Sequence, residues 1–145
     1  MLRGGRLMTK ISTKDWRSLP LDRWNVTTFH AYIVDRTSEL YGVDYAPGGG
    51  GSKSARWSRE KGMLKQAQGT YGNAVLRKFI DLCHANYTPK REYPYPAFTF
   101  MYAYQDRLFA QAQTAIAEEK RREGALTGVE ERAKALADED WGDWL

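Results

Sequence analysis

The sequence has little of the residue types from which disulfides and metal sites are built. Of its 145 residues one is cysteine, Cys83, and two are histidines, His30 and His84. A single cysteine excludes an internal disulfide and a cysteine zinc site, and neither histidine stands at a spacing that zinc sites use. The chain also lacks an apolar run long enough to span a membrane and an apolar signal segment. We therefore expect a cytoplasmic protein without metal or other cofactor.

Patterns typical of catalysis are missing as well. Cys83 and His84 are adjacent, and adjacent positions of a helix point about 100° apart, so the two cannot form a thiol–imidazole pair. Cys83 fits an apolar stripe and is predicted to be a core thiol. The glycines 48–51 are followed by Ser52 and Lys53, the reverse of the order in a phosphate-binding loop. The chain is predicted not to be an enzyme, and no catalytic or metal-binding residue is assigned.

The chain does contain enough apolar residues for one core. Hydrophobic residues make up 42% of the sequence and aromatic residues 13%, which at this length suits a single domain. There is no convincing alternating strand and no internal repeat. The predicted fold is all-α: a compact bundle of about four helices with a long fourth helix and a flexible acidic C-terminal tail. The divisions are an N-terminal extension (1–25) whose tryptophans dock onto the domain, a helical domain (26–123) with a flexible glycine-rich loop (47–52), and a C-terminal helix and tail (124–145).

Capping residues, apolar spacing and glycine stops place the first two helices. Thr27 and Thr28 are candidate N-caps of the first helix, which Gly42 is expected to end. The second is expected from near Ser54 to Tyr71. Both therefore flank the glycine-rich loop.

The last two helices are separated by a proline-containing connection. Asn73 is expected to cap the third helix, which has the clearest amphipathic stripe of the sequence. Three prolines keep residues 88–97 extended. The fourth helix is expected to carry one apolar face from Phe98 to Ile116 and to end at Gly124.

The net charge of +4 conceals an asymmetry along the chain. Residues 51–107 have ten Lys/Arg against four Asp/Glu, a net of +6, whereas residues 108–145 have five against nine, a net of −4. A basic segment attracts polyanions such as nucleic acid; the alternative is a solvated surface of mixed charge. The residues predicted to bind nucleic acid are Lys53, Arg56, Arg59, Lys61, Lys65, Arg77, Lys78, Lys90 and Arg91.

Two further patterns bear on nucleic-acid binding. Tyr87, Tyr93 and Tyr95 surround the basic pair 90–91, and exposed aromatic rings beside cations form stacking platforms for unpaired bases. Alternatively these tyrosines hold the proline loop against the helices with their hydroxyls outward. The short turn at 71–73 also suits a helix-turn-helix unit, in which the second or third helix would enter a major groove.

The C-terminal end combines acidic residues with tryptophan. Such a segment can be steered to a basic pocket by its charge and anchored there by its indoles. It is similar to the acidic C-terminal tips of bacterial and phage single-stranded-DNA-binding proteins, which recruit replication partners, but it uses tryptophan and ends in leucine. Alternatively the tryptophans pack onto the domain, or the tail folds back and competes for the basic face. The predicted partner-binding residues are Asp138, Glu139, Asp140, Trp141, Asp143, Trp144 and Leu145.

A broader resemblance covers residues 55–105, about a third of the chain. The residues that carry it are Gly62-Met63-Leu64-Lys65, Tyr71-Gly72, Leu76-Arg77-Lys78-Phe79-Ile80-Asp81, Tyr87-Thr88-Pro89, Tyr95-Pro96 and Phe98-Thr99-Phe100-Met101. They resemble small proteins encoded by tailed bacteriophages and placed with replication or regulatory genes. The resemblance implies a viral accessory protein of DNA replication or transcription and transfers no catalytic residue. The alternatives are a pure protein-interaction factor that modulates a host polymerase or helicase, and a structural virion component.

Overall fold

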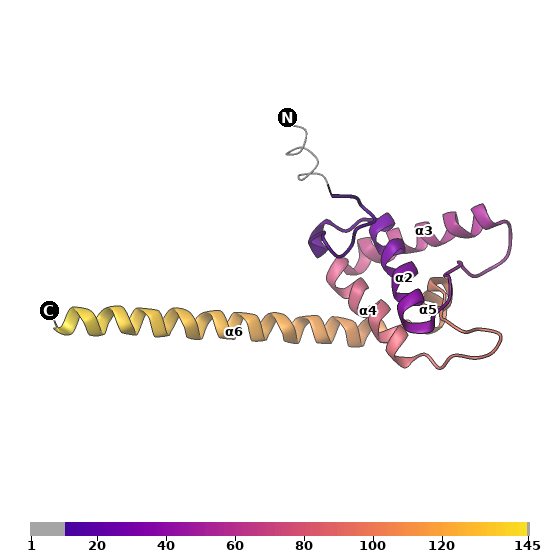
Figure 1. Ribbon diagram of the computed structural model, residues 1–145. Coiled ribbons are helices and arrows are strands. Elements are labelled where there is room, and N and C mark those ends of the chain that lie inside the picture. Colours follow the sequence, from indigo (N-terminus) through magenta and orange to yellow (C-terminus); the bar gives the residue numbers. More distant parts are fainter. Residues whose placement is uncertain (1–10, 145) are drawn as a thin grey trace, which may run out of the picture.

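All regular elements in the described part of the chain are helices (Figure 1). The computed structural model describes residues 11–144, and their side chains as far as residue 137. The all-α prediction is confirmed over these residues, with five α-helices instead of the four expected and with no strand. None of the helices in this range combines the length and apolar character needed to cross a bilayer. The elements are the 3-10 turn η1 (Leu21–Arg23) and the α-helices α2 (Val26–Tyr41), α3 (Lys53–Tyr71), α4 (Asn73–Asn86), α5 (Phe98–Tyr104) and α6 (Arg107–Trp144).

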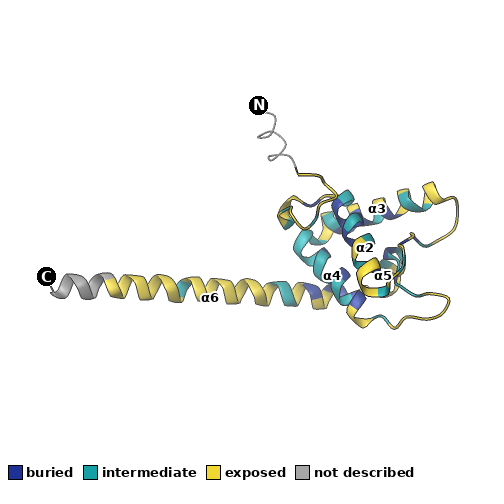
Figure 2. Cartoon of the chain, viewed as in Figure 1, coloured by how far each residue is buried: buried dark blue, intermediate teal, exposed yellow. Residues whose placement is uncertain are grey.

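The core lies where α2, α3, α4 and α5 meet the first turns of α6 (Figure 2). At its centre Phe109 of α6 is sandwiched between two rings, stacking on Phe79 with ring centroids 3.6 Å apart and on Tyr71 at 4.0 Å. Phe98 of α5 meets Phe79 edge-on at 6.4 Å. These contacts join four helices through one aromatic cluster, which buries much apolar area.

The amphipathic stripe predicted for the third helix is confirmed on α4. Leu76, Phe79, Ile80 and Cys83 are all at most 3% exposed. Burial of such side chains stabilises the fold by about 1.5–3 kcal/mol each. The stripe thus makes α4 the central helix of the body.

The first helix begins earlier than predicted. Asn25 is the N-cap of α2: its side chain accepts the Thr28 N–H at 3.0 Å, and the Thr28 hydroxyl oxygen accepts the Asn25 N–H at 3.2 Å. The predicted caps Thr27 and Thr28 are therefore wrong, because Asn is at least as good an N-cap and Thr28 completes a capping box from inside the helix. The predicted stop is confirmed, since Gly42 ends α2 in the left-handed conformation with φ 69°.

Replacement of Gly42 by alanine is expected to lower the free energy of unfolding by about 1–2 kcal/mol, because an L side chain is strained at this positive φ. Gly62, inside α3, has open space around it, so Gly62→Ala is the matched control. It is expected to raise the free energy of unfolding by about 0.5–1 kcal/mol through helix propensity. Urea unfolding followed by circular dichroism measures both, and two changes of the same sign would contradict the assignment.

The prediction that Asn73 caps α4 is wrong. Its side chain instead holds the N-terminal segment in place. Asn73 is the first residue of α4, and its side-chain amide donates to the carbonyl oxygens of Leu21 at 2.8 Å and Trp24 at 3.0 Å. The N-cap position belongs to Gly72, which makes no side-chain cap. The docking of the tryptophans is confirmed, since Trp24 is 2% exposed and Trp16 packs against the core.

The predicted fourth helix is two helices, and the second does not end at Gly124. The chain breaks at Gln105 and Asp106, so Phe98 and Leu108 lie on different helices, α5 and α6. α6 then continues through Gly124 and Gly128. A glycine costs a helix only about 1 kcal/mol, and the neighbouring alanine, leucine, glutamate and arginine residues favour it.

The acidic end is therefore not observed as a separate flexible tail. Residues 124–144 belong to α6, which projects away from the body (Figure 1). The predicted partner-binding side chains of residues 138–144, and all of Leu145, lie outside the described part, as do residues 1–10 of the predicted N-terminal extension.

Candidate nucleic-acid interface

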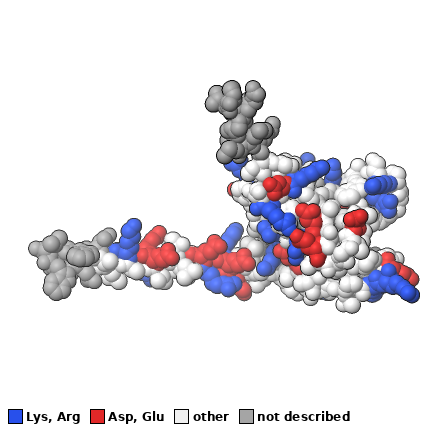
Figure 3. Space-filling model, viewed as in Figure 1, with Lys and Arg blue, Asp and Glu red and all other residues white. Residues whose placement is uncertain are grey.

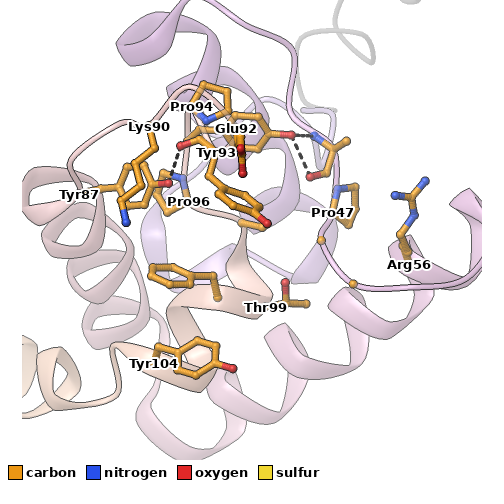
Figure 4. Close-up of a pocket in the computed structure, with 16 residues that line it drawn as sticks. Pro47, Arg56, Tyr87, Lys90, Glu92, Tyr93, Pro94, Pro96, Thr99 and Tyr104 are labelled. Carbon is orange, nitrogen blue, oxygen red and sulfur yellow. Dashed lines mark hydrogen bonds between the residues drawn. The ribbon is translucent and has the colours of Figure 1, made fainter.

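A hollow of about 660 Å³ lies between the loop that follows α2, the first turn of α3, the connection between α4 and α5, and α5 itself (Figure 4). We call it the aromatic groove. Its walls are mainly proline and aromatic side chains, among them Pro47, Pro96, Tyr93, Phe100 and Tyr104. Sites of this size and lining are typical of ligand binding.

Three of these rings expose an unusually large part of their surface. Tyr93 is 66% exposed, Tyr104 70% and Phe100 36%. Phe100 lies 5.6 Å from Tyr104 between ring centroids and 6.0 Å from Tyr87, so Phe100, Tyr104 and Tyr87 form one group of rings. Adjacent exposed aromatic rings mark interaction sites more often than isolated ones do.

The neighbouring tyrosines hold the connection in place. The Tyr95 hydroxyl accepts the Ala46 N–H at 2.9 Å and donates to the Ala46 carbonyl oxygen at 3.2 Å, and the Tyr87 hydroxyl donates to the Tyr93 carbonyl oxygen at 2.6 Å. The backbones of Lys90 and Tyr93 pair in both directions at 3.1 Å. Tyr87 and Tyr95 thus position the loop with their hydroxyls engaged, while Tyr93 presents its ring to the groove (Figure 4).

Two of the predicted basic residues line the groove from opposite sides, Arg56 from α3 and Lys90 from the connection (Figure 4). Arg56 is half-buried, and its Nε atom has no hydrogen-bond partner among the described residues. Arg59 donates to the Gly50 carbonyl oxygen at 2.9 Å and so braces the glycine-rich loop. The acidic residue at the groove is Glu92.

The remaining basic residues of α3 lie on another face. Lys61 and Lys65 are exposed, and at about 100° per residue they lie roughly 140° and 180° around the helix from Arg56. Blue side chains gather over α3 and over the α4–α5 connection in Figure 3, with mostly uncharged surface between them. Lys53, the first residue of α3, and Arg91, within the connection, are exposed as well.

The two basic residues of α4 are engaged elsewhere. The Arg77 guanidinium lies over the rings of Trp24 and Tyr32, at 5.0 Å and 5.1 Å from their centroids. The Lys78 Nζ atom pairs with Glu119 of α6 at 3.6 Å. The nine predicted residues therefore do not form one surface.

The burial of α4 also limits the helix-turn-helix hypothesis. Gly72 alone joins α3 to α4, but every α4 residue from Asn73 to His84 is buried or half-buried. A recognition helix needs an exposed face to enter a major groove. Of the two helices, α3 has such a face.

A buried polar network escaped the sequence analysis. The Glu60 Oε1 atom accepts from the Tyr45 hydroxyl at 2.6 Å and lies 3.0 Å from the His30 Nε2 atom, and the Tyr45 oxygen accepts the Phe98 N–H at 2.9 Å. Burial and Glu60 raise the pKa of Tyr45 well above its usual value. Glu60 follows Trp57 by three residues on the inner face of α3, a spacing that signals burial. Because Glu60 is fully buried, the network joins helices and is closed to a substrate.

The adjacent pair Cys83 and His84 is also enclosed. Cys83 is 3% exposed, and burial raises its pKa to about 12, which confirms the predicted core thiol. Neither ring nitrogen of His84 has a hydrogen-bond partner among the described residues. Burial, with a smaller contribution from Arg36, lowers the pKa of His84 to about 4. Within residues 11–137 no three side chains of metal-binding type come together.

Stability is expected to fall in acid because of His84. Its pKa lies near 4 in the folded protein against an ordinary 6.5, so the unfolded chain takes up the proton first as the pH drops. The contribution of neutral His84 to the free energy of unfolding is up to about 3 kcal/mol. It is complete above pH 6.5 and is lost as the pH falls from 6.5 to 4. Urea unfolding between about pH 7.5 and 4.5 measures this slope. His84→Leu should flatten it, and an unchanged slope would contradict the assignment.

The projecting part of α6 carries a second feature that suits binding. Leu126, Val129 and Leu136 are 63%, 53% and 59% exposed. Their spacing of three and seven residues places them on one side of the helix. This apolar side lies beyond the part of α6 that packs against the core.

The comparisons with known proteins give no relative for the chain. No protein-family model matches it, and neither the curated proteins nor the solved structures contain a significant match.

Proposed function

We propose that the protein is a non-enzymatic, phage-type accessory protein of DNA replication or transcription that binds nucleic acid through its basic middle. The observation that supports this most is the aromatic groove, which combines exposed rings with Arg56 and Lys90 on opposite sides. Cations bind phosphates, and aromatic faces bind bases. The nearby Lys53, Arg59 and Arg91 extend the positive field.

The test is the binding of labelled single- and double-stranded DNA at salt concentrations between about 50 and 200 mM. Affinity is expected to fall steeply with salt, because each neutralised phosphate releases counterions. The combined variant Arg56→Ala, Lys61→Ala, Lys65→Ala should bind more weakly and with a shallower salt slope. Leu126→Ala, far from the basic segment, is the control and should bind as the unchanged protein does. Failure to bind either DNA at low salt would refute the proposal.

The C-terminal part of α6 is proposed to recruit a protein of the replication or transcription machinery. The exposed apolar side at Leu126, Val129 and Leu136 favours this role, and the acidic residues after 137 would add charge steering. Deletion of residues 138–145 is expected to abolish co-purification of a host protein from a lysate. Retention of that protein by the deleted chain would show that residues 138–145 are not needed and would leave the apolar side at Leu126, Val129 and Leu136 as the candidate site.

The exposed apolar side of α6 also supports a second candidate function. In it the protein is an interaction factor that modulates a host polymerase or helicase without binding DNA. A pull-down with and without nuclease separates the two. In the first case part of the captured material depends on nucleic acid. In the second the nuclease has no effect and the purified protein does not bind DNA.

A further inference from the structure

We infer that the aromatic groove binds single-stranded nucleic acid, with unpaired bases against Tyr93 and Tyr104 and phosphates at Arg56 and Lys90. This inference rests on the proposed function and specifies which form of nucleic acid the protein recognises. It assigns a binding role to Tyr104 of α5, which lies outside the tyrosine-rich stretch around Lys90.

The exposed rings indicate bases as the ligand. Neither the Tyr93 hydroxyl nor the Tyr104 hydroxyl makes a hydrogen bond within the described residues, and both rings are about two-thirds exposed. In this they differ from Tyr87 and Tyr95, whose hydroxyls hold the loop. Every base has a flat face that stacks on such rings whatever the sequence.

The size of the groove indicates a single strand. Its volume of about 660 Å³ lies within the range of roughly 300–1,000 Å³ that accommodates small ligands. A short stretch of one strand fits this space. A duplex is too wide to enter, and its paired bases present edges, not faces, in the grooves.

The charges favour an anionic ligand rather than an apolar peptide. Arg56 and Lys90 approach the groove from two different segments. A phosphate backbone that passes both cations satisfies them. Glu92, which also lines the groove, opposes such a ligand, so Glu92→Gln is expected to tighten binding severalfold.

The experiment measures fluorescence anisotropy of a labelled oligothymidine of about 16 nucleotides and of a duplex of the same length. The single strand is expected to bind at least about tenfold more tightly. Tyr93→Ala and Tyr104→Ala should each weaken single-strand binding about tenfold, whereas Tyr93→Phe, which keeps the ring, should bind like the unchanged protein. Both tyrosines are exposed, so the variants are expected to fold, which circular dichroism checks.

Charge variants locate the site on the molecule. Arg56→Ala with Lys90→Ala is expected to reduce single-strand affinity about tenfold or more and to lower the salt slope. The comparison variant is Lys61→Ala with Lys65→Ala, which removes the same charge from the opposite side of α3 and is expected to lose less affinity. A larger loss in this variant would overturn the inference.

The other outcomes separate this inference from the proposed function. Equal affinity for duplex and single strand, with no effect of the tyrosine variants, overturns the inference and leaves nucleic-acid binding intact. Failure to bind either form overturns both. Binding of a labelled proline-rich peptide that oligothymidine does not displace also overturns it, because the groove would then be a peptide site.

Discussion

Phe79→Ala is expected to lower the free energy of unfolding by about 3–5 kcal/mol. The ring is fully buried, stacks on Phe109 and meets Phe98 edge-on. Its removal leaves a cavity at the point where α4, α5 and α6 meet, and the three helices cannot close it without shifting from their packed positions. Urea unfolding monitored by circular dichroism and tryptophan fluorescence provides the measurement.

The matched control for the core substitution is Phe100→Ala. Phe100 is the same residue type but 36% exposed at the rim of the aromatic groove, so the expected loss is about 1 kcal/mol. Equal losses for the two variants would show that the aromatic cluster does not hold α6 to the body.

His30→Leu is expected to lower the free energy of unfolding by about 2–4 kcal/mol. The substitution leaves the Glu60 carboxyl group fully buried with Tyr45 as its one hydrogen-bond partner among the described residues. A buried polar group that loses a partner is more costly than a pair replaced as a whole.

The double variant His30→Leu, Glu60→Leu tests this reasoning. Because the double change removes both polar groups, its loss of stability is expected to be smaller than the sum of the two single losses. Denaturant unfolding of the four proteins gives the coupling energy. Additive losses would mean that the contact contributes nothing to stability.

The sequence predicted correctly those features that depend on residues close together in the chain. The stripe on α4 and the glycine at the end of α2 depend on residues within a few positions of each other, and both are confirmed. The break between α5 and α6 was not predicted, because the residues from Phe98 to Ile116 keep one helical spacing across it. The break is decided by packing, with α5 against α3 and α4 and α6 along α4.

The candidate site was predicted in part for the same reason. The tyrosines around Lys90 were found because they are neighbours in the sequence, whereas Arg56 and Tyr104 join them only through the fold. The pairing of Lys78 with Glu119 was not predicted, because Glu119 lies on a helix further along the chain. Glu60 was missed since its neighbours are charged and only its spacing from Trp57 indicates burial.

The length of α6 fixes a distance between the two proposed binding functions. With a rise of about 1.5 Å per residue, the helix from residue 120 to residue 144 measures roughly 35 Å. The helix therefore fixes both the distance of a partner bound near its end from the groove and the rotation of that partner about the helix axis. One inserted residue would turn that partner by about 100°, whereas seven would move it about 10 Å outward with almost no turn.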